Sequence, residues 1–145
     1  MQSVEEAGAL LEGIQECFRD RTLFQWGIAR AADDQVVGTC TLGALQWKHR
    51  RGELGFALAR AYWRQGYVRE ALPEVVRFAF VDLDLHRLEA DVDPRNTASL
   101  HVIESLGFKR EGYLRERYHV NGEVQDAALY GLLRDECSLL PHHLP

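Results

Sequence analysis

A basic loop containing a single glycine separates an apolar segment from an amphipathic one within residues 52 to 72, GELGFALARAYWRQGYVREAL. Gly66 tolerates backbone angles and a close approach of ligands that other residues do not. Arg64 and Arg69 add positive charge, and the backbone N–H groups of residues 65 to 69 stand where a helix begins. Such N–H groups and the positive end of a helix dipole can bind a phosphate or pyrophosphate. A glycine that only starts a helix is the alternative.

Hydrophobic periodicity and turn residues predict the elements that position this loop. The order is helix, three strands, helix, strand, helix and two strands, which indicates a mixed α/β sheet with helices packed on it. A doubly wound dinucleotide fold is not expected, because its fingerprint needs three spaced glycines. The predicted elements are a helix over 4–18, strands over 23–32 and 36–45 around Asp33-Asp34-Gln35, a strand over 53–58, a helix from the Gly66 loop to Leu83, a strand over 87–92, a helix over 97–106 between Asn96 and Gly107, and strands over 113–120 and 125–133 around Asn121-Gly122.

The composition narrows the class of protein. The chain has 145 residues, which suits one domain, and a net charge of −5, which argues against a general nucleic-acid binder and fits a cationic partner. No apolar run approaches the ~20 residues of a membrane span, and no secretory signal opens the chain. Cys17, Cys40 and Cys137 are far apart, so neither a disulfide framework nor a zinc site is expected. We therefore expect a cytoplasmic protein without a metal.

Two segments and a hairpin together resemble the GNAT acetyltransferase superfamily, and specifically its RimJ/RimL-like branch, which acetylates the N-termini of ribosomal proteins. The branch has a glycine–aromatic–small run at a strand end, then a tyrosine–tryptophan–glycine loop, then N-x-x-S, a helix and Gly-Phe. A closing hairpin carries an acidic residue before the last strand. The resemblance covers about residues 20 to 135, and the matching residues are Gly55 to Leu58, Tyr62 to Val68, Asn96, Ser99, Gly107-Phe108, Asn121-Gly122 and Asp126.

This resemblance implies acetyl-CoA as co-substrate. In the fold of the family, the strand before the loop splays from the next strand, and the pantetheine arm adds to the gap like an extra strand. One N–H group of that strand would stabilise the oxyanion that forms when an amine attacks the thioester. The implied cofactor-binding residues are Phe56, Ala57, Leu58, Arg64, Gln65, Gly66, Tyr67, Val68, Arg69 and Asn96.

Several features depart from the pattern of the branch. Position 64 is Arg where the branch commonly has glycine, and position 68 is Val where the superfamily prefers Gly or Ala, so the phosphate loop is crowded. Pro73 falls inside a predicted helix and should bend it. The chain also lacks a segment resembling the opening strand of the branch, so we expect the first strand of the sheet to be missing.

The resemblance implies two catalytic residues. Glu53 lies on the splayed strand, where some members carry a catalytic glutamate, and burial at the strand edge would raise its pKa toward the range of a general base. An exposed strand carboxylate is the alternative. Ser99 matches the serine proposed as the general acid in ribosomal-protein acetyltransferases, although a serine in the first turn of a helix can serve only in capping.

Other positions bear on the same chemistry. Many members use as acid a tyrosine seven residues after the asparagine, but that position is Ile103, so this chain lacks it. Tyr118 falls near where the ribosomal enzymes place a glutamate; it is either a substitute polar group or, as we favour, a packing aromatic. Asn96 is expected to contact pantetheine and also to cap its helix.

The sequence thus predicts an N-acetyltransferase that moves an acetyl group from acetyl-CoA to a primary amine. A protein N-terminal α-amine is preferred on the resemblance, and a homodimer is compatible with it. The alternatives are acetylation of a small amine such as a polyamine, an amino acid or an antibiotic, and a non-catalytic module that binds CoA or a partner. Neither a nucleic acid nor a membrane is expected as a partner.

Overall fold

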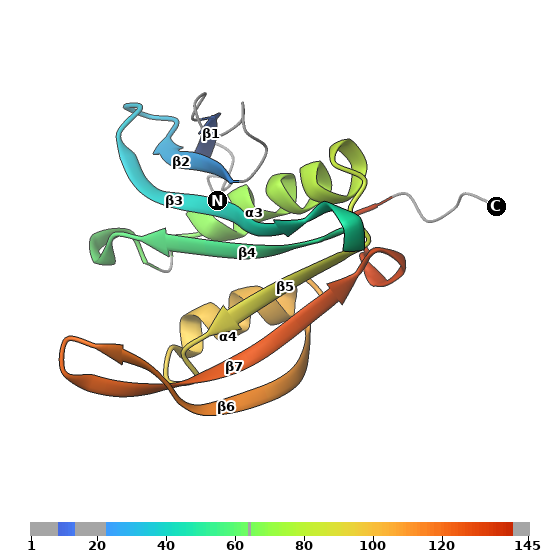
Figure 1. Cartoon of the computed structure of the whole chain (residues 1–145). Coiled ribbons are helices and arrows are strands. Elements are labelled where there is room, and N and C mark those ends of the chain that lie inside the picture. The colour runs from blue at the N-terminus through green and yellow to red at the C-terminus, as the bar shows by residue number, and fades with distance from the viewer. Residues whose placement is uncertain (1–8, 14–22, 64, 141–145) are drawn as a thin grey trace.

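The computed structural model describes residues 9–13, 23–63 and 65–140, and its described strands form one sheet in the order β1-β2-β3-β4-β5-β7-β6 (Figure 1). The strands are β1 (Ala9–Gly13), β2 (Phe24–Arg30), β3 (Val36–Gln46), β4 (Arg51–Leu58), β5 (Arg87–Val92), β6 (Lys109–Val120) and β7 (Glu123–Leu133). The helices are α3 (Tyr67–Arg77), which continues into a π-helical turn (Phe78–Asp82), and α4 (Thr97–Ser105). Short 3₁₀ turns lie at Trp47–His49, Arg60–Tyr62 and Arg134–Glu136.

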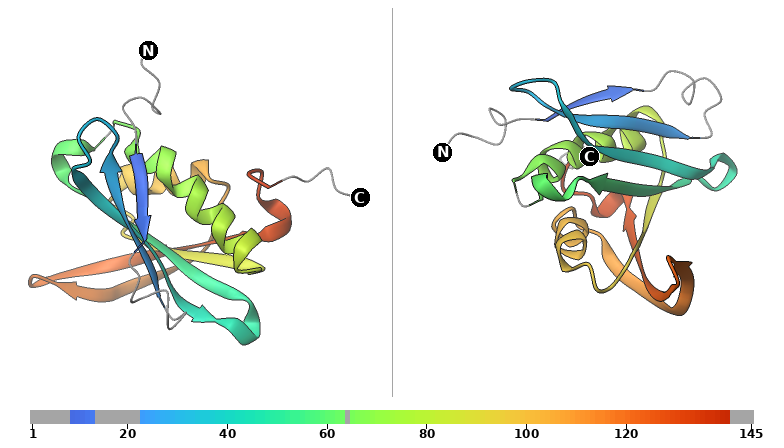
Figure 2. Two further views of the ribbon diagram at one scale, coloured as in Figure 1. Left: turned by 90° about the horizontal axis from the view of Figure 1, so that it is seen from above. Right: turned by 90° about the vertical axis from the view of Figure 1, so that its left-hand side faces the viewer.

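Both helices cover the same face of the sheet (Figure 2). Alternate strand residues point to this face, where Leu54 of β4 and Leu88 of β5 are buried with Leu72 of α3 and Ile103 of α4 in one apolar core. The residues between them in sequence, such as Glu53, point to the opposite face, because successive side chains of a strand alternate. Among the described residues, the sheet therefore separates a face covered by α3 and α4 from a more polar face that no described helix covers, here called the open face.

Most of the locally encoded elements are confirmed. The hairpin at Asn121-Gly122 has both turn residues at positive φ, 52° and 80°, as a two-residue turn of this kind requires. The carbonyl oxygen of the Asn96 side chain accepts a hydrogen bond of 3.0 Å from the backbone N–H of Ser99, so Asn96 caps α4. Gly107 follows the end of α4 with a φ of 101°, the conformation of a C-terminal glycine.

The predictions for the first twenty residues need correction. Residues 9–13 are not helical: they form β1, which pairs antiparallel with β2 through partners such as Leu10 and Ala29. The rest of the predicted helix over 4–18 lies outside the described residues. The expectation that the first strand of the sheet is missing is also wrong, since β1 occupies the edge beside β2. The remainder of the predicted fold class, a mostly antiparallel sheet with one splayed parallel pair, is confirmed.

The helix after the Gly66 loop also differs in its second half. Hydrophobic periodicity predicts one helix to Leu83, but the α-helical part ends at Arg77 and Phe78–Asp82 form a π-helical turn. Pro73 stands inside α3, which continues beyond it for another turn. A π-helical turn holds more residues than an α-helical turn, which changes the directions of the side chains. Phe80 nevertheless remains fully buried in the core.

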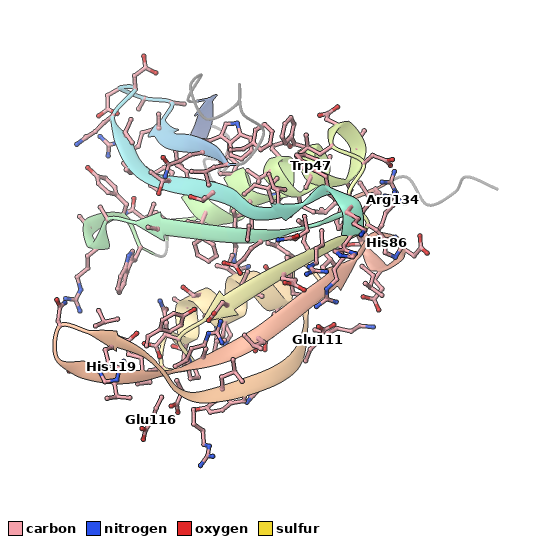
Figure 3. All side chains as sticks on the ribbon, viewed as in Figure 1. Trp47, His86, Glu111, Glu116, His119 and Arg134 are labelled. Atoms are coloured by element: carbon pink, nitrogen blue, oxygen red, sulfur yellow. The ribbon has the colours of Figure 1, made fainter. Side chains whose placement is uncertain are left out.

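The parallel strands β4 and β5 form a wedge. They pair only over Arg51–Glu53 and Arg87–Glu89, after which β4 continues to Leu58 and β5 to Val92 without pairing to each other. At the closed end, the backbone oxygen of Arg50 accepts hydrogen bonds from the N–H groups of His86 (2.7 Å) and Arg87 (3.1 Å). Arg134 donates its own N–H to the oxygen of His86 at 2.8 Å, and the two residues lie together at this end (Figure 3). The wedge is therefore fixed at one end and open at the other.

Candidate active site

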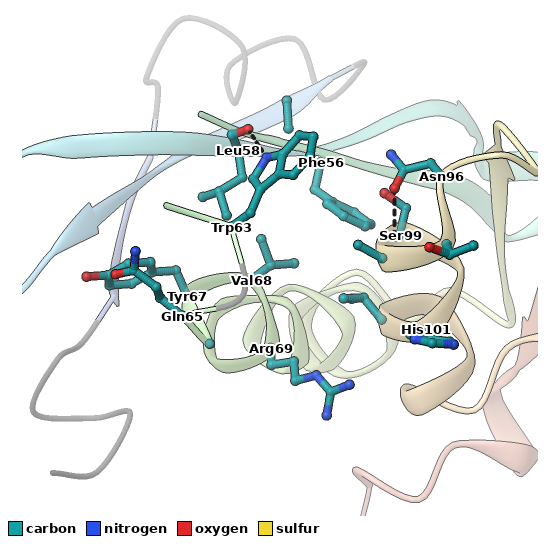
Figure 4. A pocket seen from close by; sticks show the side chains of 15 residues that line it. Phe56, Leu58, Trp63, Gln65, Tyr67, Val68, Arg69, Asn96, Ser99 and His101 are labelled. Carbon is teal, nitrogen blue, oxygen red and sulfur yellow. Dashed lines mark hydrogen bonds between the residues drawn. The ribbon is translucent and has the colours of Figure 1, made fainter. Parts of the chain in front are cut away.

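A cleft of about 970 Å³ opens at the wide end of the wedge (Figure 4). Three segments line it: residues 56–58 at the end of β4, residues 63 and 65–69 in the loop and first turn of α3, and residues 96–99 with 101 and 102 in the first turns of α4. The loop after a strand and the starts of two helices thus meet around one space. This volume suits a ligand of the size of a cofactor.

The backbone of β4 offers hydrogen-bonding groups to this space. The N–H of Ala59 donates to the oxygen of Val37 on the β3 side, at 2.8 Å. Because the N–H and C=O groups of an extended strand alternate in direction, those of Phe56 and Leu58 point the other way, toward the gap. β5 does not pair with them there. A linear ligand with amide groups could complete the sheet at this edge.

The start of α3 presents a site for an anion. Gly66 has a φ of 86° and stands at the N-terminal cap of α3, and its oxygen accepts the N–H of Glu70 at 3.0 Å. This left-handed conformation is one that side-chain-bearing residues rarely adopt, which accounts for glycine at the position. The following N–H groups are unpaired within the helix, as they are in any first turn. The Arg69 side chain lies at the same cleft, so the charge and the N–H groups favour a phosphate.

Trp63 shapes the other side of the cleft. Its indole N–H donates to the backbone oxygen of Leu58 at 2.8 Å, and 44% of the residue is exposed (Figure 4). The indole therefore stands beside the free edge of β4 and holds the loop against the strand. An oxygen of this kind has two lone pairs, so the bond leaves capacity for a ligand.

Glu53 does not line the cleft. It is exposed on the opposite face of the sheet, at the last position where β4 and β5 pair, directly across from Glu89. Partial desolvation, followed by the negative charges of Asp91 and Glu89, raises the pKa of its carboxyl above the ordinary value, while Arg117 opposes this rise. The Glu53 side chain makes no hydrogen bond or ion pair with any other described residue. Its side-chain lone pairs are thus available at the point where the two strands begin to separate, as a general base requires.

These features are those of an acetyl-transferring enzyme, and the sequence bears this out. The family model for the acetyltransferase (GNAT) domain matches residues 1–109. The chain is a GNAT acetyltransferase. Members of this family use acetyl-CoA as the acetyl donor and act on an amine, so the expectation drawn from the sequence is confirmed at this level.

Relatives of this acetyltransferase differ in the acceptor that their names give. An uncharacterized N-acetyltransferase of Bacillus subtilis, YoaA, is 32% identical over 134 residues, which cover 92% of this chain and 76% of the relative. A spermidine N(1)-acetyltransferase of Vibrio cholerae is 26% identical over 109 residues, 75% of this chain and 63% of that one. The ribosomal-protein-S5-alanine acetyltransferase structure from Vibrio fischeri superposes with a TM-score of 0.78 at 25% identity, covering 88% of this chain and 69% of the other.

Two further findings concern partners and metals. Within the part of the chain that the structure describes, no helix is both long and apolar enough to cross a membrane. The same residues contain no group of three or more His, Cys, Asp or Glu side chains placed to hold a metal ion.

The structure brings together most of the site residues predicted from sequence. Every predicted cofactor-binding residue that is described lines the cleft, and Ser99 lines it as well; Arg64 lies outside the described residues. Glu53 lies apart, across the sheet at the wedge. The prediction missed Trp63 and His101, which line the cleft too. Trp63 belongs to the tyrosine–tryptophan–glycine loop motif, and His101 stands two residues after Ser99 on α4, so their positions in or near the motifs could have indicated them.

Proposed function

We propose that acetyl-CoA binds in the cleft and that its acetyl group is transferred to a primary amine that arrives from the opposite face of the sheet. The wedge between β4 and β5 carries this proposal, because it connects the lined cleft with the Glu53 face. The residues fit the co-substrate: the backbone of Phe56 and Leu58 suits the amides of pantetheine, and the Gly66 turn with Arg69 suits the pyrophosphate. Asn96, already capping α4, would contact the arm with its side-chain N–H groups.

Different groups of the chain would carry out the separate steps of the acetyl transfer. Acetyl-CoA supplies an acetyl group activated as a thioester. Glu53 would take a proton from the acceptor ammonium, and a β4 backbone N–H would stabilise the developing oxyanion. Ser99 would protonate the departing sulfur and would regain a proton from the nitrogen, which loses its second proton as the amide forms. A C–N bond replaces the C–S bond, and one proton is released for each ammonium that becomes an amide.

We infer that the preferred acceptor is a protein N-terminal α-amine. Such an amine has a pKa of about 7.7–8.0, against about 10.4 for lysine, so a single glutamate suffices to deprotonate it near neutral pH. The structural similarity to a ribosomal-protein-S5-alanine acetyltransferase supports this choice. The exposed position of Glu53 is also compatible with an acceptor that is part of a larger molecule.

A polyamine is the second candidate. Glu53, Glu89 and Asp91 share the open face, where Arg87 and Arg117 balance only part of their charge. A partly uncompensated negative surface attracts a polycation. The relatives named as spermidine acetyltransferases support this alternative.

An acceptor screen tests the proposed function. The purified chain would be incubated with acetyl-CoA and, separately, with peptides beginning in Ala, Ser and Gly, with the same peptides blocked at the α-amine but bearing lysine, and with spermidine. Mass spectrometry should show one acetyl group on the unblocked peptides and a much slower reaction with the blocked ones. Reaction with spermidine alone would favour the second candidate. If acetyl-CoA binds but no amine reacts, both candidate acceptors are contradicted, and the chain is a module that binds CoA without catalysis.

A further inference from the structure

Gly55 lies inside β4 at a position where no neighbouring atom requires a glycine. It lies two residues after Glu53, so a side chain at position 55 would point to the same open face of the sheet. A Cβ atom built there would meet no described atom within 4 Å. By contrast, a Cβ atom on Gly52, also on β4 but facing the core, would come within 2.8 Å of the Leu45 side chain. Packing thus explains the glycine at 52 and does not explain the glycine at 55.

Position 55 also lies where the two strands have separated. The last residues that pair between β4 and β5 are Glu53 and Glu89. Gly55 lies two residues beyond, opposite the part of β5 around Asp91 that no longer pairs with β4. Glycine weakens a strand interior, and in such a place it often marks a close approach of a ligand. Among the described residues, the space above Gly55 is therefore open, and it lies beside the gap between the two strands.

The far side of this open space is a wall of hydrogen-bonded side chains from β5 and β6. The Tyr118 hydroxyl donates a hydrogen bond to Asp91, whose side chain is only 15% exposed, and the Arg117 guanidinium lies 3.7 Å from the same carboxylate. Asp126 holds the bulge of β6 that directs Tyr118 there, because its carboxylate accepts the N–H of Glu116 at 2.7 Å and the Tyr113 hydroxyl. Glu116 and His119 mark this curved hairpin in Figure 3. The wall is thus built by hydrogen bonds, whereas the Gly55 side is empty.

The direction of approach follows from the layers of the molecule. On the helix side, the wedge opens into the cleft that Phe56 and Val68 help to line, and the proposed function places acetyl-CoA there. An acceptor amine must then reach the gap from the open face, across Gly55 or across the wall opposite. Since the wall is fixed, any substituent on the carbon that bears the amine must be accommodated above Gly55.

We propose that Gly55 determines the specificity of the acetyltransferase for its acceptor. The missing side chain leaves room for a substituent on the carbon next to the reacting nitrogen, such as the methyl group of an N-terminal alanine. Unbranched amines, such as an N-terminal glycine or spermidine, do not need this room. This inference rests on the proposed function and deepens it by naming the feature of the acceptor that the enzyme admits.

Substitution of Gly55 by Ala, Val and Leu tests the inference. The kcat/KM for an Ala-starting peptide should fall progressively, by about tenfold or more for Gly55→Val, while that for the matched Gly-starting peptide falls much less. Acetyl-CoA affinity, measured by titration calorimetry, should be unchanged. The melting temperature should be unchanged or higher, because Val suits a strand better than Gly. A general structural defect would not change the ratio between the two peptides.

The outcomes separate this inference from the proposed function. Parallel losses for both peptides, or no loss in Gly55→Leu, would overturn the role of Gly55 while the wild-type activity stands. Loss of acetyl-CoA binding in the same variants would also overturn it, because it would place position 55 in the cofactor cleft. A second readout needs no turnover: binding of the Ala-starting peptide to the CoA-saturated protein should weaken in Gly55→Val. Failure of the proposed function appears instead as a wild-type chain that acetylates no amine.

Discussion

Replacement of Gly66 by Trp is expected to abolish acetyl-CoA binding, with a loss of affinity of more than about a hundredfold, or roughly 2.7 kcal/mol. Gly66 lines the cleft at the start of α3, where an indole would fill the space next to the helix N-terminus. The substitution would also disturb the turn, because its φ of 86° disfavours any side chain by about 1–2 kcal/mol. Titration calorimetry with acetyl-CoA measures the effect.

Gly122 provides a matched control for the strain. It has a φ of 80° in the turn between β6 and β7, does not line the cleft, and has no described atom within 4 Å of the place that a Cβ atom would take. Gly122→Trp carries a comparable backbone penalty and should keep its affinity for acetyl-CoA. Equal losses in the two variants would mean that strain or misfolding, rather than occupation of the cleft, explains the result for Gly66.

The second large effect is expected for Glu53→Gln, with a fall in kcat of about a hundredfold or more, the range attributed to general base catalysis. Acetyl-CoA affinity should not change, because Glu53 lies outside the cleft. In the wild type, kcat/KM should fall as the pH drops through the pKa of Glu53, which is raised mainly by desolvation and then by Asp91 and Glu89. This acid limb should disappear from the pH profile of the variant.

Stability gives an independent check on Glu53. Its folded-state pKa is raised, so ionisation is less favourable in the folded state than in the unfolded chain. Glu53→Gln should then be slightly more stable than the wild type above the raised pKa, by at most about 1 kcal/mol because the group is exposed and screened. The difference should vanish below the ordinary pKa of glutamate.

Glu89→Gln is a matched control for the loss of activity. This variant also removes a carboxylate from the open face, but one that the Arg87 guanidinium already holds at 2.9 Å. It should retain most of the activity. If Glu53→Gln retains its activity too, the acceptor is deprotonated by solvent and Glu53 is not the base.

Local signals in the sequence account for the elements that were predicted correctly. Asn121-Gly122 specifies a tight hairpin turn by itself, and Asn96 specifies a helix start through a bond to a residue three positions away. The Gly66 loop is likewise defined by its own backbone conformation. Because the residues that line the cleft belong largely to these local motifs, most of the cleft could be predicted from the sequence.

The features that were missed depend on contacts between distant segments. Leu10 and Leu11 fit a helical period, but they lie in a strand because β1 pairs with residues 26–30 of β2. Strand alternation puts Glu53 and Gly55 on one face, but the sequence does not show that α3 and α4 both cover the other face. The bond from Trp63 to Leu58 depends on the path of the loop, and the Tyr118–Asp91 bond depends on a bulge in β6. A local pattern contains none of this information.

Hydrogen–deuterium exchange with and without acetyl-CoA tests most directly whether the cleft is the cofactor site. Binding should slow exchange in peptides that cover residues 54–58, because the Phe56 and Leu58 N–H groups would gain partners across the gap. Protection should extend to residues 65–69 and 96–102, and the hairpin around Gly122 should exchange as before. Saturation with acetyl-CoA that leaves residues 54–58 unprotected, or that protects a different part of the sheet, would contradict this account.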